Sequence, residues 1–586
     1  MHKIITLLIV SLSCSSHHAQ NIPGDTLNGN SLPEVKISGL HINDSLMNAP
    51  ASVSVLSSKD LVRSNYINIA PALNTLAGVQ MQSGAINTNR ISIRGIGART
   101  PFGTNKIRAF YGNIPLTSGD SETTIEDLNT ENIRQVEIIK GPLSSLYGAG
   151  LGGAILLEPS IRKSVGSEAG ISTTYGSFGM LKTSVNFNVN SLTSGMNVNY
   201  HKIESEGWRQ NSKYDREAFT IAGELFRKAD RKITYLANYT WMKAFIPSSI
   251  NQATFENNPI AAAPTWLASK GYEQYKSYLI GLGYDFKIRS VKNSTSIFLN
   301  VKNSNEPRPF DILNQNTHGW GARTHFSGGF DFLKLKTNVI FGLEYFQDGF
   351  VGKTFENGYA DNSNLGSLQG EQLSGSEQKR NFYNAFSQLR FQLSDKWEVQ
   401  GGLNINKTQF ELENIFPADV RSSEKYSYDA IWSPQVSLLF KPGALSTLYL
   451  SASRGFSLPS VKETLTANGT INSEIRPENG YNFEFGGKFY FFNRHFYADF
   501  ALYRMQIKDL LVAQRIADDQ YVGVNAGKTL HQGFEVSMNY TMKATENLSF
   551  HPYITASVGS YEFEEFLDND ENFSGNELPG VPKNKL

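Results

Sequence analysis

The chain has 586 residues, with 54 Lys and Arg, 54 Asp and Glu, and a mean hydropathy of -0.32. The balanced charge argues against nucleic-acid binding, and a single cysteine, Cys14, excludes a disulfide framework and a cysteine metal site. The low mean hydropathy does not exclude membrane-spanning strands, because their alternating apolar and polar residues cancel in the average.

Residues 1–19 have the proportions of a signal peptide. A positively charged start precedes an apolar run from Ile4 to Leu12, which is too short to span a bilayer as a helix. We therefore predict export, with cleavage after Ala19. A lipoprotein signal cut before Cys14 is the alternative interpretation.

Residues 20–47 are predicted to form a flexible arm, because Asn, Gly, Ser and Asp dominate and large apolar side chains are few. One stretch within the arm alternates apolar and polar residues: Glu34, Val35, Lys36, Ile37 and Ser38. Such a segment can add as a strand to the exposed sheet edge of a partner. The alternative is an ordinary linker with a short β-prone patch.

Residues 48–160 are predicted to form a small mixed α/β domain. Short strands are expected at 49–56, 91–94, 107–111 and 134–139, with helical turns near 58–62 and 68–76. Gly148, Gly150 and Gly153 imitate a dinucleotide-binding fingerprint. That motif requires a helix after the glycines, whereas a strand pattern follows here, so we reject a dinucleotide site.

From about residue 165 the pattern changes to long alternating strands. Apolar and polar residues alternate over about ten residues at 181–190, 233–241 and 397–405, which is typical of membrane-spanning β-strands. Strands of a soluble β-sandwich, the alternative, average about five or six residues. Short turns are expected near 228–230, 394–395 and 493–494, and long loops near 244–273, 303–321, 351–377, 409–427 and 454–480.

Two motifs in the α/β region carry a family resemblance: Ile91-Ser-Ile-Arg94-Gly and Glu137-Ile-Ile-Lys140-Gly-Pro. In this order and spacing they resemble the plug of TonB-dependent outer-membrane receptors of the iron-chelate type, closest to ferric-dicitrate-like receptors. The resemblance implies a transmembrane antiparallel β-barrel with a small α/β plug domain inside the lumen. The plug would be residues 48–160, the barrel residues 165–586, and the segment Glu34 to Ser38 the TonB box.

The resemblance implies about 22 barrel strands, whereas we count about 17–18 in the sequence. In this family a Pro-Gly segment like that at Gly580 introduces a late strand, with several more to follow. We therefore expect the sequence to be truncated at its C-terminus. An incomplete barrel would leave strand edges unpaired.

The resemblance also implies a charge lock between plug and barrel. Plug cations Arg94 and Lys140 would pair with Glu484 and Glu535, which alternation places on the inner face of their strands. Independent polar residues lining the lumen are the alternative interpretation.

Cations and aromatic residues gather where a substrate would bind. Near the expected plug apex and loops these candidates are Arg99, Phe102, Lys106, Arg108, Trp208, Arg209, Trp320 and Arg323. Arg binds carboxylates bidentately and stacks on rings, so the mixture suits an anionic, partly aromatic ferric chelate. The alternative is that these are ordinary girdle and loop residues.

The implied function is TonB-dependent active import of a ferric chelate, a siderophore or ferric citrate, across the outer membrane of a Gram-negative bacterium. The alternatives are import of cobalamin, another metal chelate, heme or a glycan, and a passive porin or adhesin barrel. Heme receptors of the family carry a His in the region matching residues 455–479, where this sequence has none. The implied partners are a periplasmic TonB-type energy transducer, outer-membrane lipid and the ferric chelate, with no nucleic acid, for a monomeric barrel.

An enzyme is not expected, because the sequence lacks the His-Glu-x-x-His, Walker and Gly-x-Ser-x-Gly motifs. No cofactor is expected either, and iron would enter only as the chelated substrate.

Overall fold

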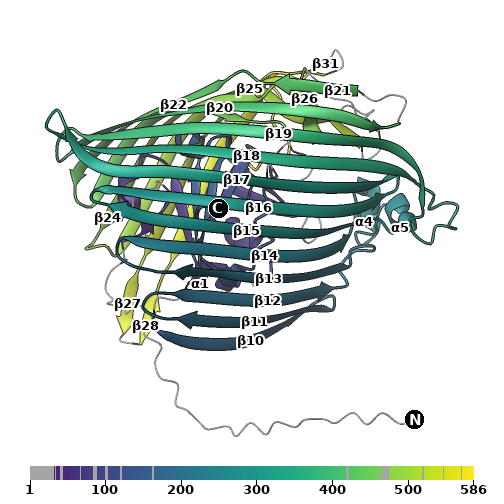
Figure 1. Ribbon diagram of the computed structural model, residues 1–586, viewed down its shortest axis with the longest axis horizontal. Coiled ribbons are helices and arrows are strands. Elements are labelled where there is room, and N and C mark those ends of the chain that lie inside the picture. Colours follow the sequence, from purple (N-terminus) through teal and green to yellow (C-terminus); the bar gives the residue numbers. More distant parts are fainter. Residues whose placement is uncertain are drawn as a thin grey trace, which may run out of the picture.

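The computed structural model describes residues 32, 34–39, 44–65, 67–83, 89–98, 100, 103–118, 122–161, 164–417, 422–460, 462–464, 474–517, 520–545, 547–568 and 571–586. The predicted signal peptide 1–19 lies outside these residues, as do most of the arm and the site candidates Arg99 and Phe102. Figure 1 shows the N-terminal elements, in purple, enclosed by the long strands of the remaining chain.

Nineteen strands form one antiparallel sheet in sequence order. They are β10 (Gly166–Gly176), β11 (Met180–Asn190), β12 (Gly195–Ser205), β13 (Tyr214–Leu225), β14 (Arg231–Phe245), β15 (Tyr272–Ile288), β16 (Val291–Arg308), β17 (Asp311–Phe332), β18 (Leu335–Asn357), β19 (Gln369–Gln392), β20 (Trp397–Phe416), β21 (Ser422–Ser427), β22 (Ile431–Gly443), β23 (Ser446–Ser457), β24 (Glu478–Phe491), β25 (Phe496–Ala517), β26 (Gln520–Tyr540), β29 (Tyr553–Glu565) and β32 (Asn584–Lys585). The prediction of a large antiparallel barrel with a plug is confirmed. The excess over the 17–18 expected strands comes from the short strands β21 and β32.

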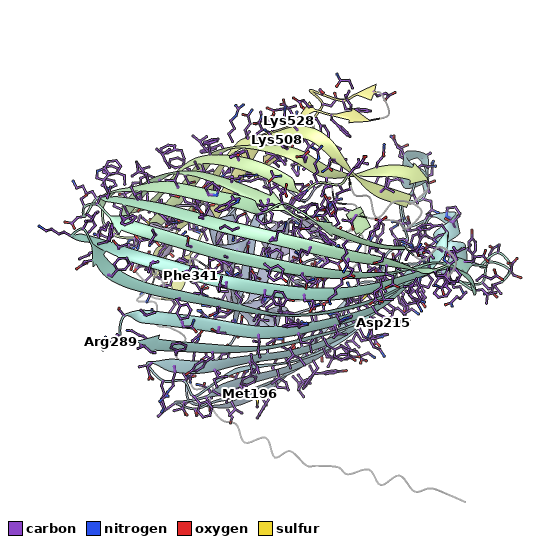
Figure 2. The ribbon with its side chains drawn as sticks, turned by 45° about the horizontal axis from the view of Figure 1, so that its top comes forward. Met196, Asp215, Arg289, Phe341, Lys508 and Lys528 are labelled. Carbon is purple, nitrogen blue, oxygen red and sulfur yellow. The ribbon has the colours of Figure 1, made fainter. Side chains whose placement is uncertain are left out.

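Alternation along each strand separates an apolar outer face from a polar inner face, because successive side chains of a strand point to opposite sides. On β24, Phe483 is 60% exposed and the next residue, Glu484, only 4%. On β26, Phe534 is 39% exposed and Glu535 only 2%. Figure 2 shows Phe341 of β18 on the outer wall, where its side chain is exposed.

The two ends of the barrel differ. Three of the predicted tight turns join consecutive strands: 228–230 joins β13 to β14, 394–395 joins β19 to β20, and 493–494 joins β24 to β25. In an antiparallel sheet every second connection lies at the same end, so these three turns share one end of the barrel. We call this the short-turn end; Arg289, between β15 and β16, marks it in Figure 2. The opposite end, the long-loop end, carries α4 (Gln252–Asn257) and α5 (Pro264–Ser269) between β14 and β15 (Figure 1).

The prediction of a long loop near 303–321 is wrong. Residues 303–308 belong to β16 and residues 311–321 to β17, so only a tight turn joins them. The polar residues there suggested a loop, but main-chain hydrogen bonds between neighbouring strands continue without regard to side-chain polarity. The wall of the barrel is therefore taller on this side than the apolar band alone indicates.

Small pieces complete the outer part of the chain. They are η4 (Lys462–Thr464), the hairpin of β27 (Met542–Thr545) and β28 (Leu548–Phe550), and the hairpin of β30 (Leu567–Asp568) and β31 (Glu571–Asn572). Within the described ranges, no helix is long and apolar enough to cross a bilayer.

The plug is built on a five-stranded sheet in the order β3-β8-β9-β6-β7, in which only β6 and β9 are parallel. Its elements are β3 (Val53–Ser57), α1 (Ser58–Ser64), α2 (Ala70–Leu73), β4 (Val79–Ser83), β5 (Asn89–Ile93), β6 (Ile107–Tyr111), β7 (Ile114–Pro115), η2 (Thr130–Asn132), β8 (Ile133–Lys140), α3 (Ser144–Tyr147) and β9 (Gly153–Pro159). A reciprocal capping box between Ser57 and Asp60 fixes the start of α1. The strand patterns of the sequence predicted most of this sheet.

The plug packs directly against the inner wall of the barrel. Its core residues Ile138, Ile155 and Leu157 belong to one apolar cluster with Leu236 of β14 and Phe298 of β16. Burial of this shared cluster accounts for part of the free energy that keeps the plug in the lumen.

Ahead of the plug, β1 (Lys36–Ile37) pairs with β2 (Asp44–Ser45), which leads into η1 (Leu46–Asn48). The Leu32 amide donates to the Arg494 carbonyl at 2.7 Å. Because Arg494 lies in a tight turn, this bond places Leu32, a described residue of the predicted arm, at the short-turn end.

Candidate functional site

Arg94 is the centre of the contact between plug and barrel. It follows β5 at a φ of 53°, and its side chain is 1% exposed. Its Nε and Nη2 each donate to one carboxylate oxygen of Glu535 at 3.0 Å, and its Nη1 donates to Glu484 at 2.5 Å. Its guanidinium also lies 4.1 Å from the ring centroid of Tyr503. Bidentate and stacked contacts of this kind are specific to Arg.

Lys140 completes the same network. Its Nζ lies 3.2 Å from Glu535 Oε2. Glu484 Oε1 accepts hydrogen bonds from the Ser52 amide at 2.9 Å and from the Tyr449 hydroxyl at 2.7 Å. The structure thus brings together the plug cations and barrel carboxylates that were predicted as partners.

The charge state of Arg94 follows from its partners. Burial alone would lower the pKa of Arg94, but the carboxylates of Glu484 and Glu535 raise this pKa well above its ordinary value. The guanidinium therefore stays charged, and its ion pairs persist throughout the physiological pH range.

The sequence alone did not predict several residues that contact this network. Gly78 has a φ of +68°, and a Cβ there would lie 1.8 Å from Glu535 Oε1, so only glycine leaves room for the carboxylate. His531 Nδ1 lies 2.9 Å from the Arg94 carbonyl oxygen. A lone Gly or His carries no local signal of such a contact.

Lys488 of β24 was also missed, although it has the inner-face alternation of Glu484. Its buried Nζ donates to the carbonyls of Leu46 at 3.1 Å, Ala49 at 2.6 Å and Ala51 at 2.9 Å. One barrel cation therefore fixes the chain where it enters the plug.

A second ion-pair network holds two of the predicted substrate residues. Arg108 of β6 donates to both carboxylate oxygens of Glu344, at 2.8 and 3.0 Å, and Arg323 of β17 donates to one of them at 2.9 Å. Arg323 also donates to the Leu146 carbonyl in α3 at 2.6 Å. Both arginines therefore connect plug and barrel.

Lys106 is likewise engaged by carboxylates. Its Nζ lies 3.2 Å from Glu463 of η4 and 3.5 Å from Glu478 of β24. Burial alone would raise the pKa of Glu463, but the ammonium of Lys106 holds this pKa below its ordinary value. The long loop that carries η4 is thereby attached to the plug.

Three other candidates in the described ranges, Trp208, Arg209 and Trp320, lie in outer connections or on the outer wall. Arg209 donates to the carbonyls of Ala261 at 2.6 Å and Ser248 at 2.9 Å, which ties two outer connections together beside the half-exposed Trp208. Trp320 is 49% exposed on the outer face, because it lies an odd number of residues from the inward-facing Arg323 on the same strand. The side chain of Trp320 therefore faces away from the lumen, and its contact with substrate stays a prediction.

A cavity of about 120 Å³ lies between plug residues 104–128 and the inner wall formed by β14 to β18. We call it the lumenal chamber. Its charged lining residues in the described ranges are Glu122, Asp127 and Lys302, and the other polar lining side chains carry hydroxyl or carboxamide groups. Nowhere in the described part of the chain do three or more His, Cys, Asp or Glu side chains form a group suited to a metal ion.

The segment Glu34 to Ser38 is held against the plug. The Ser38 amide and hydroxyl donate to Glu137 Oε1 at 2.9 and 3.0 Å, and the Gly39 amide donates to Glu137 Oε2 at 2.9 Å. Ile37 is buried, whereas Glu34 and Lys36 are exposed. The part of the predicted arm that the structure describes is therefore attached through Glu137.

Comparison with known proteins agrees with this architecture. The sequence model of the TonB dependent receptor-like beta-barrel matches residues 271–586, and that of the TonB-dependent receptor plug domain matches residues 45–155. A probable TonB-dependent siderophore receptor, PiuA of Acinetobacter baumannii, is 24% identical over 92% of this chain and 79% of its own length. An iron-regulated outer membrane virulence protein of Vibrio cholerae is 33% identical over 19% of this chain and 17% of its own length.

Solved structures share the fold. The ferric citrate transporter FecA, in its unliganded form, superposes with a TM-score of 0.76 at 16% identity, covering 92% of this chain and 81% of that one. The copper transporter OprC gives a TM-score of 0.70 at 16% identity, covering 92% and 81%. Since the barrel model alone covers more than half of the sequence, and the plug model and the enclosed plug agree with it, the chain belongs to the family of TonB-dependent outer-membrane receptors, which is made up of transport receptors.

Proposed function

We propose that the protein imports a ferric chelate actively across the outer membrane of a Gram-negative bacterium, with energy delivered by a TonB-type partner in the periplasm. The observation that carries this proposal is a plug joined to the barrel wall by buried ion pairs at Arg94, while the preceding segment lies at the short-turn end. An enclosed plug does not suit a passive pore, because passive flow needs an open lumen. Related receptors named for siderophores support iron as the cargo.

Within this proposal, the segment Glu34 to Ser38 contacts the energy transducer. Its exposed side chains Glu34 and Lys36 are available to a partner from the periplasm. Pulling on the segment would break its bonds to Glu137 first, and then load the contacts of Lys488 and Arg94.

Deleting residues 34–38 tests this function. We expect uptake of an iron-55-labelled chelate by iron-starved cells to be lost, whereas binding of the chelate to the same cells persists. A matched control deletes five residues of the predicted arm at 24–28, which lie outside the segment and should leave uptake intact. Uptake that persists without residues 34–38 would contradict energy coupling through this segment.

A further inference from the structure

Gly39 is the residue at which the segment Glu34 to Ser38 is fastened to the plug. Its amide donates to Glu137 at 2.9 Å, and its carbonyl accepts a hydrogen bond from the hydroxyl of Tyr147 in α3. A Cβ at position 39 would lie 2.8 Å from Leu156 Cδ1, so the side chains of the plug close tightly around this residue. Two hydrogen bonds, one to the amide and one to the carbonyl, therefore fix a closely packed peptide unit.

Tyr147 makes its bond to Gly39 from a buried and packed position. The residue is 2% exposed, and its ring centroid lies 5.1 Å from that of Phe110. A ring that is closely packed on its neighbours cannot swing independently of its main chain. The position of the hydroxyl therefore follows the position of the α3 backbone.

The end of α3 is held by the two arginines that share Glu344. The last carbonyls of a helix have no partner within the helix, and basic side chains can bind them. In α3 the Tyr147 carbonyl accepts from Arg108 at 2.7 Å. The Leu146 carbonyl accepts from Arg323. Each guanidinium thus spans from the Glu344 carboxylate of the barrel to one carbonyl of α3.

We propose that Tyr147 is a positioning residue that couples the docking of Gly39 to the hold of the barrel on α3 through Glu344. The hydroxyl stays within reach of Gly39 only while both arginines keep the helix end in place. Because a coupling between two sites is reciprocal, undocking of Gly39 also weakens the hold on α3. The role of this coupling in import rests on the proposed function: tension on the preceding segment would loosen the plug from the barrel at α3.

Hydrogen exchange of the peptide spanning residues 34–39, measured by mass spectrometry on the full chain in detergent, tests the coupling. Tyr147→Phe keeps the ring and removes one hydrogen bond to Gly39, so this exchange should become about fivefold faster. The matched control Tyr111→Phe removes a buried hydroxyl that donates to the Asn132 carbonyl at 3.1 Å, and should leave the exchange unchanged. Unchanged exchange in Tyr147→Phe overturns the proposal.

Glu344→Gln tests whether the hold of the barrel reaches that peptide. Because Gln cannot accept from both arginines as the carboxylate does, exchange of the peptide should become at least about threefold faster. The control Glu463→Gln weakens the ion pair of Lys106, another contact between plug and barrel, and should have no effect on it. Arg323→Lys is a second, milder variant, which keeps the charge but cannot span from Glu344 to α3, and it should act in the same direction. Exchange that is unchanged in both variants overturns the coupling.

The double variant separates this coupling from a general loosening of the plug. If Glu344 acts through the Tyr147 hydroxyl, Glu344→Gln should add less than about twofold in the Tyr147→Phe background. The peptide spanning β9, residues 153–159, is the internal reference and should exchange at the same rate in every variant. Additive acceleration, or equal acceleration of the reference peptide, overturns the proposal. Since neither chelate nor transducer is present, such a failure leaves ferric-chelate import standing, and the deletion of residues 34–38 tests import separately.

Discussion

At the scale of single residues, Arg94 joins two barrel strands to the plug through one guanidinium. Replacing one partner of a buried ion pair leaves the other charge buried without compensation, which costs about 3–5 kcal/mol. An exposed pair contributes at most about 1 kcal/mol, so position rather than charge decides the effect.

Arg94→Met should therefore release the plug more readily. The variant removes the guanidinium shared by the buried carboxylates of Glu484 and Glu535, and the stability of the seated plug should fall by about 3–5 kcal/mol. Electrical conductance of the reconstituted protein in a planar bilayer, measured against urea concentration, reports the opening of the lumen. The control Arg134→Met removes a half-exposed plug arginine that pairs within the plug, with Glu158, and should leave the transition unchanged. An unchanged midpoint in Arg94→Met would count against the locking role.

Glu126 and Glu131 should give stability profiles of opposite sign. Burial raises the pKa of the Glu126 carboxyl to about 7, from an ordinary 4.5, so the folded state takes up a proton between these values. Its stabilising contribution is present below pH 4.5 and is lost as the pH rises through 7. Glu126→Gln should therefore raise the thermal midpoint in detergent at pH 8 and have little effect at pH 5.

Glu131 provides the contrast for this measurement. Burial alone would raise its pKa, but the ammonium of Lys182 at 3.3 Å lowers it. Its contribution is present above its ordinary pKa and is lost in acid, so Glu131→Gln should lower the midpoint at pH 8. Shifts of the same sign in both variants would contradict this assignment.

The family resemblance implied that Arg94, Lys140, Glu484 and Glu535 are neighbours. The motif places the cations in the plug, and period-two alternation places the carboxylates in the lumen. Neither signal shows which protein group already pairs with a charged side chain. For this reason Arg108 and Arg323 were predicted to contact the ligand, although both form ion pairs with Glu344.

At the scale of elements, the sequence predicted where the strands lie but not how long they are. Alternation of apolar and polar residues identifies a strand only where one face meets lipid. Beyond the lipid, β16 and β17 continue as polar strands, and for this reason residues 303–321 resembled a loop. The attachment of β1 to Glu137 was equally invisible, because those residues lie about a hundred positions apart.

Glu137→Gln should release the segment that contains β1. The carboxylate accepts from the amides of Ser38 and Gly39, and hydrogen bonds to a charged group contribute about 1.5–3 kcal/mol each. The amide group of Gln keeps one acceptor but points a donor at these N–H groups. Hydrogen exchange of the peptide spanning residues 34–39, followed by mass spectrometry, should become at least about tenfold faster. Glu158→Gln, on the neighbouring strand β9, should leave that exchange unchanged; equal protection in both variants would exclude the attachment.

At the scale of the whole molecule, import requires the plug to move relative to the barrel. Ser145 of α3 donates a hydrogen bond to Gln435 of β22, so these positions lie across the boundary between the two bodies. A covalent tie there should hold the plug in place without closing the lumenal chamber.

Ser145→Cys combined with Gln435→Cys, joined by a short cleavable thiol cross-linker, should retain chelate binding and lose uptake. Cleaving the linker should restore uptake. The matched control joins Ser437→Cys to Ser451→Cys, which face each other on neighbouring barrel strands and leave the plug free. Undiminished uptake by the cross-linked pair would contradict plug movement at α3.

Gly78 extends these conclusions to sequence variation. Because the carboxylate of Glu535 occupies the space that any Cβ at position 78 would need, substitutions at these positions should depend on each other. In a library of variants selected for growth on chelated iron, side chains at 78 should survive only where residue 535 has become shorter. Such paired survival would reveal from genetics alone that two segments separated by most of the polypeptide are in contact.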